Sequence, residues 1–450
     1  MGCHKEGLVS SDVLALVMFP LLLVGLFTGH HIGAVLGGLG LIFGIVGLGP
    51  QILPNFVMRA NAFLSDWILV AIPLFVLMAN FLERTGVAAG MFQAVRYVFG
   101  PLRGGVAAAV IAICTLLAAC TGIVAAGVIS AGLVSVGPMQ KYGYDKSLTA
   151  GVIAAGGTLG ILIPPSTMLV LMGSFSGVSV GLLFAGAIMP GLILSALYLA
   201  YILVRCYLRP QDGPALSIEE RRAVSIPMRA KMAVKSVIPP VILIVGVLGT
   251  ILFGVATPTE AAGVGAFLAF LMTLAYKTCT WKGIKESVIN TATTTSMIVF
   301  IGIGGICFGT TFTRLGGGEI VVGWLLGVAE FSGTWGLIGV MLVTFFLLGC
   351  FIDWLPIMFI TFPVFIPVAT QVGIDLLYLV VLLSTLCQTC FLTPPFGYAL
   401  FYLKGVLPLE ITTSHVYRGV IPFILLQLIG VALCLSFPQI ILWLPSVLVG

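Results

Sequence analysis

The chain has 450 residues, of which 60% are hydrophobic and 8% are charged, with 20 lysines and arginines against 15 aspartates and glutamates. An ordinary soluble domain carries about 25% charged residues, so this composition excludes a soluble enzyme or a nucleic-acid-binding domain. Residues 104–140, 147–204 and 376–403 hold no charged side chain, and each run exceeds the ~20 apolar residues that span a bilayer. The runs do not alternate as β-barrel strands would, so the sequence predicts an all-α polytopic membrane protein.

Hydropathy along the chain predicts membrane spans separated by short connections. Residues 51–65 and 281–290 are shorter and more polar, which is typical of helices lying at the membrane interface. Residues 1–12 are few and carry Lys5 beside Glu6, so the apolar segment after them is predicted to be a first span and not a cleaved signal peptide. The spans are expected at 12–28, 30–48, 67–83, 181–206, 237–256, 258–276, 294–313 and 419–445.

Residues 208–236 are polar and divide the chain into two halves, 1–207 and 237–450. Their excess of basic residues predicts a cytoplasmic linker. The halves are related by a repeat, because a shift of 230 residues superposes polar, glycine and proline positions that membrane periodicity alone would not align. The pairs are Arg84 with Arg314, Gly86 with Gly316, Gly143 with Gly373, Asp145 with Asp375, and Pro164–Pro165 with Pro394–Pro395.

The distribution of basic residues predicts that the two copies are inverted in the membrane. Residues 138–147 hold two lysines, whereas the equivalent residues 367–377 hold no lysine or arginine. Re-entrant hairpins at 104–136 and 334–366 place 17 of the 20 basic residues on one side of the membrane, which single crossings do not achieve. The hairpin tips fall at Cys120-Thr121-Gly122 and at Ile352-Asp353.

Each half also contains a predicted broken helix, at 148–175 and at 376–407. Proline removes an amide donor and moves the preceding residue out of the α region, so neither Pro164–Pro165 nor Pro394–Pro395 continues a helix cleanly. Carbonyl groups freed by such a break could bind a small cation at membrane depth. The alternative is a structural kink without a ligand.

Asp353 is the only charged residue between Glu330 and Asp375. A charge at membrane depth costs at least ~2.5–3.5 kcal/mol, so a bound Na⁺ or a proton is expected to compensate it. Alternatively, residues 334–366 do not form the predicted hairpin, and Asp353 lies at the water interface. The sequence contains no Walker, G-x-S-x-G or H-E-x-x-H motif, so neither ATP hydrolysis nor intramembrane proteolysis is expected.

Three motifs carry a resemblance to a known family: residues 156–166 (GGTLGILIPPS), 257–262 (TPTEAA) and 392–397 (LTPPFG). They resemble the large membrane subunit of TRAP (tripartite ATP-independent periplasmic) transporters. The resemblance covers nearly the whole chain and implies an elevator-type secondary transporter of the bacterial inner membrane. It also implies coupling to a Na⁺ gradient, a small four-helix membrane subunit, and a periplasmic substrate-binding protein that delivers an organic acid. Many members of the family carry Asn-x-Glu before their Thr-Pro-Pro, whereas residues 386–390 here read LCQTC. This departure, with residues 399–405 (ALFYLKG) after it, looks closer to the branch labelled for 2-oxo acids, mannitol or chloroaromatic acids.

The same resemblance implies two sodium sites and no catalytic residue. The remaining alternative is a stand-alone Na⁺- or H⁺-coupled organic anion carrier of related inverted-repeat fold. The first Na⁺ site would comprise Cys120, Thr121, Gly122, Gly157, Thr158, Pro164 and Ser166; the second Asp353, Thr393, Pro394 and Gly397; and the candidate substrate residues are Thr167, Arg314 and Gln388.

Overall fold

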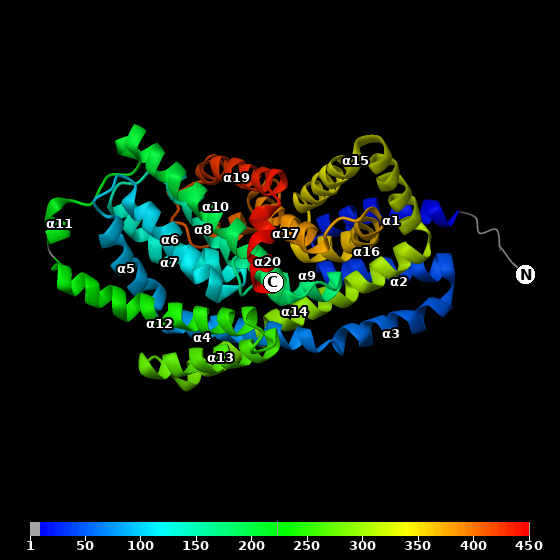
Figure 1. The fold of residues 1–450 in the computed structure, drawn as a ribbon, viewed down its shortest axis with the longest axis horizontal. Helices are drawn as coiled ribbons and strands as arrows, with labels where there is room; N and C mark the ends of the chain where they lie inside the picture. The colour runs from blue at the N-terminus through cyan, green and yellow to red at the C-terminus, as the bar shows by residue number, and fades with distance from the viewer. Residues whose placement is uncertain (1–9, 223, 450) are drawn as a thin grey trace, which may run out of the picture. The chain divides into compact units, whose positions relative to one another are not determined.

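The computed structural model describes residues 10–222 and 224–449, except for the side chains of residues 119–121, 221, 222, 226 and 449. In this part of the chain all regular structure is helical (Figure 1). The chain forms two compact units: unit 1 holds residues 1–67 and 293–379, and unit 2 holds residues 68–292 and 380–450. Each sequence half contributes to both units, so the compact units are not the repeats. The repeat itself, the inverted orientation of its two copies and the cytoplasmic location of the linker stay predictions.

Unit 1 is built on aromatic and glycine contacts between its first two helices and the later part of α14. The Phe19 ring meets the rings of Phe308 and Phe312 edge-on, with centroids 5.8 and 5.0 Å apart. The Thr311 hydroxyl donates to the Gly40 carbonyl oxygen at 2.7 Å. The helices are α1 (Ser11–Phe27), α2 (Ile32–Leu48), η1 (Pro50–Ile52), α3 (Leu53–Leu64), α14 (Trp281–Arg314) from residue 293, α15 (Gly317–Gly349) and α16 (Trp354–Val372).

Unit 2 contains the other helices, and glycines allow some of them to pack very closely. α4 lies along α13, and α8 lies along α19 (Figure 1). At the α8–α19 contact, a side chain on Gly151 would collide with the Gly419 carbonyl group. The elements are η2 (Trp67–Val70) from residue 68, α4 (Ala71–Arg84), α5 (Val87–Phe99), α6 (Gly105–Thr121), α7 (Val124–Lys141), α8 (Lys146–Thr158), η3 (Leu159–Ile161), α9 (Thr167–Ser176), α10 (Val180–Leu208), η4 (Pro210–Asp212), α11 (Ile218–Arg222), α12 (Ile226–Leu252), α13 (Pro258–Ala275), the part of α14 before residue 293, α17 (Leu376–Leu392) from residue 380, α18 (Tyr398–Lys404), α19 (Thr413–Ser436) and α20 (Gln439–Val449).

Among the described residues, eight helices are long and apolar enough to cross a membrane, which confirms a polytopic all-α protein. They cover residues 67–84, 180–208, 227–252, 258–275, 281–314, 317–349, 354–372 and 413–436. The predicted spans at 12–28 and 30–48 correspond to α1 and α2, which have 17 residues each. That length is at the lower limit for crossing a bilayer.

Three of the predicted helix boundaries were wrong. The span expected at 237–256 is α12, which begins at Ile226, so residues 226–236 of the expected linker are helical; Ser225 caps this helix and a proline lies in its first turn, where proline is tolerated. Residues 281–290, expected as a separate interfacial helix, are the first turns of α14, because no proline or glycine lies between Gly283 and Gly302 to end the helix. The span expected at 419–445 is divided into α19 and α20. The break lies at Phe437, which has φ −128° and ψ 80°. Pro438 follows it, and a proline disfavours the helical conformation of the residue before it.

The two halves share local geometry at the positions that the 230-residue shift aligns. Gly86 and Gly316 have left-handed φ values of 68° and 89°, and each of them precedes a helix. Gly143 and Gly373 have left-handed φ values of 72° and 78°. The carboxylates of Asp145 and Asp375 each accept a hydrogen bond from the backbone three residues later, at 2.8 and 3.0 Å. These bonds satisfy amide groups that the first helical turn leaves without partners.

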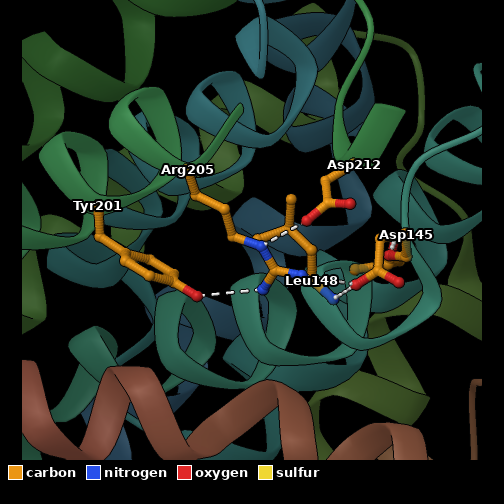
Figure 2. Close-up of polar contacts among 6 residues, drawn as sticks. Asp145, Leu148, Tyr201, Arg205 and Asp212 are labelled. Carbon is orange, nitrogen blue, oxygen red and sulfur yellow. Dashed lines mark hydrogen bonds and ion pairs between the residues drawn. The ribbon is translucent and has the colours of Figure 1, made fainter. Parts of the chain in front are cut away.

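An ion-pair network fixes the start of α8 (Figure 2). The Arg205 guanidinium donates to the carboxylates of Asp145 and Asp212 at 3.0 and 2.8 Å, and to the Tyr201 hydroxyl at 3.0 Å. Asp145 is also the N-cap of α8. The backbone adds a hydrogen bond from the Gly104 amide to the Gly213 carbonyl at 2.7 Å. The first residues of the linker are thereby attached to the entrances of both α6 and α8.

We expect Arg205→Ala to lower the stability of the chain by about 2 kcal/mol. Breaking a buried ion pair costs ~3–5 kcal/mol, and the cost here should be smaller because the Asp145 carboxylate keeps 33% of its exposure. Thermal unfolding of the purified chain in detergent measures the change. Arg209→Ala is the matched control, since Arg209 is exposed and forms no ion pair with the rest of the described chain. Equal shifts in the two variants would contradict a stabilising network.

Candidate ion and substrate site

The first expected hairpin corresponds to α6 and α7, which pack side by side in unit 2 (Figure 1). They are joined at Gly122, which has a left-handed φ of 57°, and at Ile123, which is extended. Glycine suits this turn because it adopts positive φ without steric cost. The side chains of Cys120 and Thr121 lie outside the described residues, so their proposed part in a Na⁺ site stays a prediction.

The first break separates α8 from α9. α8 ends at Thr158, and α9 starts at Thr167 with Ser166 as its N-cap. The Thr158 hydroxyl donates to the Ala155 carbonyl at 2.9 Å, and the Ser166 hydroxyl donates to the Ile161 carbonyl. Both side chains are fully buried. Residues 162–166, which include Pro164, connect the helices without regular helical structure, so some carbonyl groups here have no partner within a helix.

The tip of the first hairpin contacts this break directly. The Thr167 hydroxyl donates to the Gly122 carbonyl oxygen at 2.7 Å. A Cβ atom on Gly122 would lie 3.5 Å from the carbonyl oxygen of Pro165. The structure therefore brings Gly122, from the predicted first site, together with the residues that follow Pro164.

A second contact joins the hairpin to the last turn of α8. A Cβ atom on Gly157 would lie 2.6 Å from the Cα atom of Val128, and one on Gly127 would lie 2.6 Å from the Gly157 carbonyl oxygen. The two backbones touch because both glycines lack a side chain. Gly127 was not among the predicted site residues. Its one signal in the sequence is a glycine inside an apolar helix, a pattern that also occurs without a close contact.

The predicted second site falls on residues of both units. Asp353, in unit 1, is half-buried, and its carboxylate accepts a hydrogen bond from the Trp354 amide at 2.8 Å, as the N-cap of α16. In unit 2, the Thr393 hydroxyl donates to the Thr389 carbonyl at 2.7 Å. Pro394 follows it, and Gly397 caps α18 with a φ of 44°. The role of Asp353 as the N-cap of α16 is enough to explain an aspartate at this position, without a bound ion. The assembly of the second site from these residues stays a prediction.

The three candidate substrate residues have different surroundings. Thr167 is bonded to the hairpin tip, as described above. Arg314, in unit 1, donates to the side-chain oxygen of Asn55 at 3.0 Å. Gln388, in α17, is fully buried, and both polar atoms of its amide lack a hydrogen-bond partner within the described part of the chain. A buried amide without partners is costly, so a polar ligand beside Gln388 would be stabilised.

The first break offers hydroxyl and carbonyl oxygens, and no charged side chain lies between residues 147 and 204. Among the described residues no group of three or more His, Cys, Asp or Glu side chains could hold a metal ion. Neutral oxygens from unwound backbone are the ligands that membrane transporters present to Na⁺. The α9 N-terminus at the same place favours negative charge. The region combines groups suited to a monovalent cation with groups suited to an anion.

Comparisons with known proteins agree with this architecture. Residues 16–440 match the family described as "Tripartite ATP-independent periplasmic transporter, DctM component". The chain is 29% identical to the C4-dicarboxylate TRAP transporter large permease protein DctM of Pseudomonas aeruginosa, covering 85% of this chain and 87% of that protein. It is 30% identical to the ectoine/5-hydroxyectoine TRAP transporter large permease protein UehC of Ruegeria pomeroyi, covering 96% of each. The crystal structure of the Alcanivorax borkumensis YdaH transporter has the same fold, with a TM-score of 0.60 at 15% identity over 95% of this chain and 98% of that one.

Proposed function

This chain belongs to the DctM component family of tripartite ATP-independent periplasmic (TRAP) transporters, and we propose that it performs Na⁺-coupled secondary active uptake of a small organic acid. As a large permease subunit it is a multi-pass protein of the bacterial inner membrane and a transporter, not an enzyme. The observation that carries the proposal is the contact of the Gly122 hairpin tip with the broken helix at Pro164–Thr167.

The proposed coupling uses the oxygens at this contact. Na⁺ would bind among the backbone carbonyls of the break and the hydroxyls of Thr158 and Ser166, with the hairpin tip as the opposite wall. A bound cation would hold the tip against the break and bring positive charge to a region that the α9 N-terminus already makes favourable for an anion. The solute anion and the ion would therefore stabilise each other's binding, which is the thermodynamic basis of symport. Thr393 and Asp353 would contribute to a second ion site.

We further propose two partner proteins. The relatives are described as large permease proteins of TRAP transporters, a name that implies a smaller membrane subunit, expected to have four helices. A periplasmic binding protein would deliver the solute. The two relatives carry different solutes by name, C4-dicarboxylate and ectoine, so the solute differs within the family. A 2-oxo acid or a related carboxylate remains our proposal for this chain.

The test is solute uptake into proteoliposomes that contain this chain, the small subunit and the binding protein, with the solute that the cognate binding protein retains. Uptake should require an inward Na⁺ gradient and all three proteins. Uptake without the binding protein would favour the alternative, a stand-alone carrier. Uptake that is indifferent to Na⁺ would refute the proposed coupling.

We expect Thr158→Ala and Thr393→Ala each to raise, by about tenfold, the Na⁺ concentration that gives half-maximal uptake. Each removes one oxygen from a proposed ion site, and a polar contact with an ion contributes roughly 1.5 kcal/mol or more. Thr149→Ala is the control, because Thr149 is also buried in α8 and donates to a backbone carbonyl at 2.9 Å but lies more than two turns from the break. If all three variants respond alike, the effect is structural and the ion sites lie elsewhere.

A further inference from the structure

An apolar groove opens on the side of unit 2 beside the first break. It has a volume of about 230 Å³ and is lined by side chains of α6, α10 and α12 together with Ile163 and Pro164. Its one polar side chain, Thr115, has its hydroxyl 2.8 Å from the Ile111 carbonyl oxygen and 3.0 Å from the Ser195 hydroxyl. No polar atom on a lining side chain is therefore left to bind a hydrophilic ligand, and an apolar occupant fits the groove.

The groove is continuous with the surface that these membrane helices expose to lipid. Two lining residues, Leu192 of α10 and Val245 of α12, are 48% and 63% exposed. Leu192 lies near the middle of the 29-residue α10, so the groove opens at hydrocarbon depth. From the groove, exposed apolar side chains continue along α12 toward its N-terminus, through Ile238 and Val234.

Two lysines lie at the end of this apolar stripe. Lys231 and Lys235 are exposed on the first turns of α12, and neither forms an ion pair with another described residue. Lys235 precedes the first lining residue of α12, Val241, by six residues, which is about 9 Å along a helix. α5, which packs against α12, contributes only Arg96 as a charged residue. α13, α10 and α6 also pack against α12, and among them only α13 carries an acidic residue, Glu260 in its first turn. The opposite end of α13 lies beside Lys235, because the Tyr276 hydroxyl donates to the Lys235 carbonyl oxygen. These neighbouring helices therefore do not neutralise the positive charge at this end.

We propose that this face of unit 2 is a binding site for one anionic phospholipid. Lys231 and Lys235 bind the phosphate-containing headgroup, and one acyl chain runs along α12 into the groove and ends against Ile163 and Pro164. The lysines supply charge complementarity for an anionic headgroup near the membrane surface, and the groove supplies the apolar surface for the chain. The lipid contacts the break through the apolar side chains of Ile163 and Pro164, whereas the Gly122 tip contacts the break through a hydrogen bond.

The experiment is native mass spectrometry of the purified full-length chain, titrated with phosphatidylglycerol or with phosphatidylcholine of identical acyl chains. One phosphatidylglycerol should bind roughly 25-fold more tightly than phosphatidylcholine. Lys231→Gln combined with Lys235→Gln should abolish that preference, since each basic side chain near an anionic lipid adds about a factor of five. Lys285→Gln, which removes an exposed lysine of α14, should leave the preference unchanged.

A second pair of variants tests the groove itself. Val245→Trp should fill the groove and weaken binding of both lipids about tenfold. Ile242→Trp places the same ring on an exposed α12 residue that does not line the groove, and should have a clearly smaller effect. Both positions are exposed, so neither variant should prevent folding, and circular dichroism checks this. Equal affinity for the two lipids, an unchanged preference in the double lysine variant, or equal effects of the two tryptophans would each overturn the proposal.

Discussion

Replacing Gly157 by alanine should reduce Na⁺-dependent uptake by about tenfold or more, although the chain should still insert and purify. A Cβ atom at this position would lie 2.6 Å from the Val128 Cα atom and 2.7 Å from its amide nitrogen. These are backbone atoms, so no side-chain rotation relieves the collision, and α7 must shift relative to α8. Overpacking of this kind costs typically 1–3 kcal/mol, which corresponds to a factor of about 5 to 150 in an equilibrium. The shift would separate the hairpin tip from the break.

Gly137→Ala is the matched control for this variant. Gly137 lies in the same helix, α7, but nothing lies within 4 Å of the position that its Cβ would occupy. Uptake and its Na⁺ dependence should therefore match those of the unsubstituted protein. Proteoliposome uptake at a series of Na⁺ concentrations is the measurement. If Gly157→Ala transports normally, the close contact between α7 and α8 is not required for the proposed ion site.

Much of this architecture could be predicted from local signals. Pro164–Pro165 and Pro394–Pro395 break their helices because proline acts on its immediate neighbours, so the breaks appear where the sequence predicted them. The expected tip at Gly122 coincides with the turn between α6 and α7 for a similar reason, since a left-handed glycine is a local feature. The polytopic helical fold followed from composition, because hydrophobic length directly reflects bilayer thickness.

Contacts between distant residues could not be predicted in this way. The approach of Gly127 to Gly157 depends on how two helices pack, and the local sequence of neither helix indicates which other helix it contacts. Arg205 was visible only as a charge at the end of a span, because its partners Asp145 and Asp212 lie in separate connections. The interleaving of the two halves into two compact units is likewise a property of tertiary packing. The predicted repeat rests on similarity between the sequences of the two halves. The compact units depend instead on which surfaces pack together in the folded chain.

We expect Asp353→Asn to raise the Na⁺ concentration for half-maximal uptake by at least about tenfold while leaving thermal stability nearly unchanged. Asn caps a helix about as well as Asp, so the hydrogen bond from the Trp354 amide, now 2.8 Å, should persist. Only the negative charge is lost. An interaction with a charged group contributes roughly 1.5–3 kcal/mol, and this sets the expected loss of Na⁺ affinity.

Asp375→Asn separates charge from capping. Asp375 accepts a hydrogen bond from the Tyr378 amide at 3.0 Å at the start of α17, so the same substitution removes a charge from a cap outside the proposed ion sites. Its Na⁺ dependence should not change. If Asp353→Asn also leaves Na⁺ activation unchanged but removes a pH dependence of uptake, Asp353 carries a proton instead of Na⁺. If neither response changes, the carboxylate serves only as the cap of α16, and the second ion site must be sought without it.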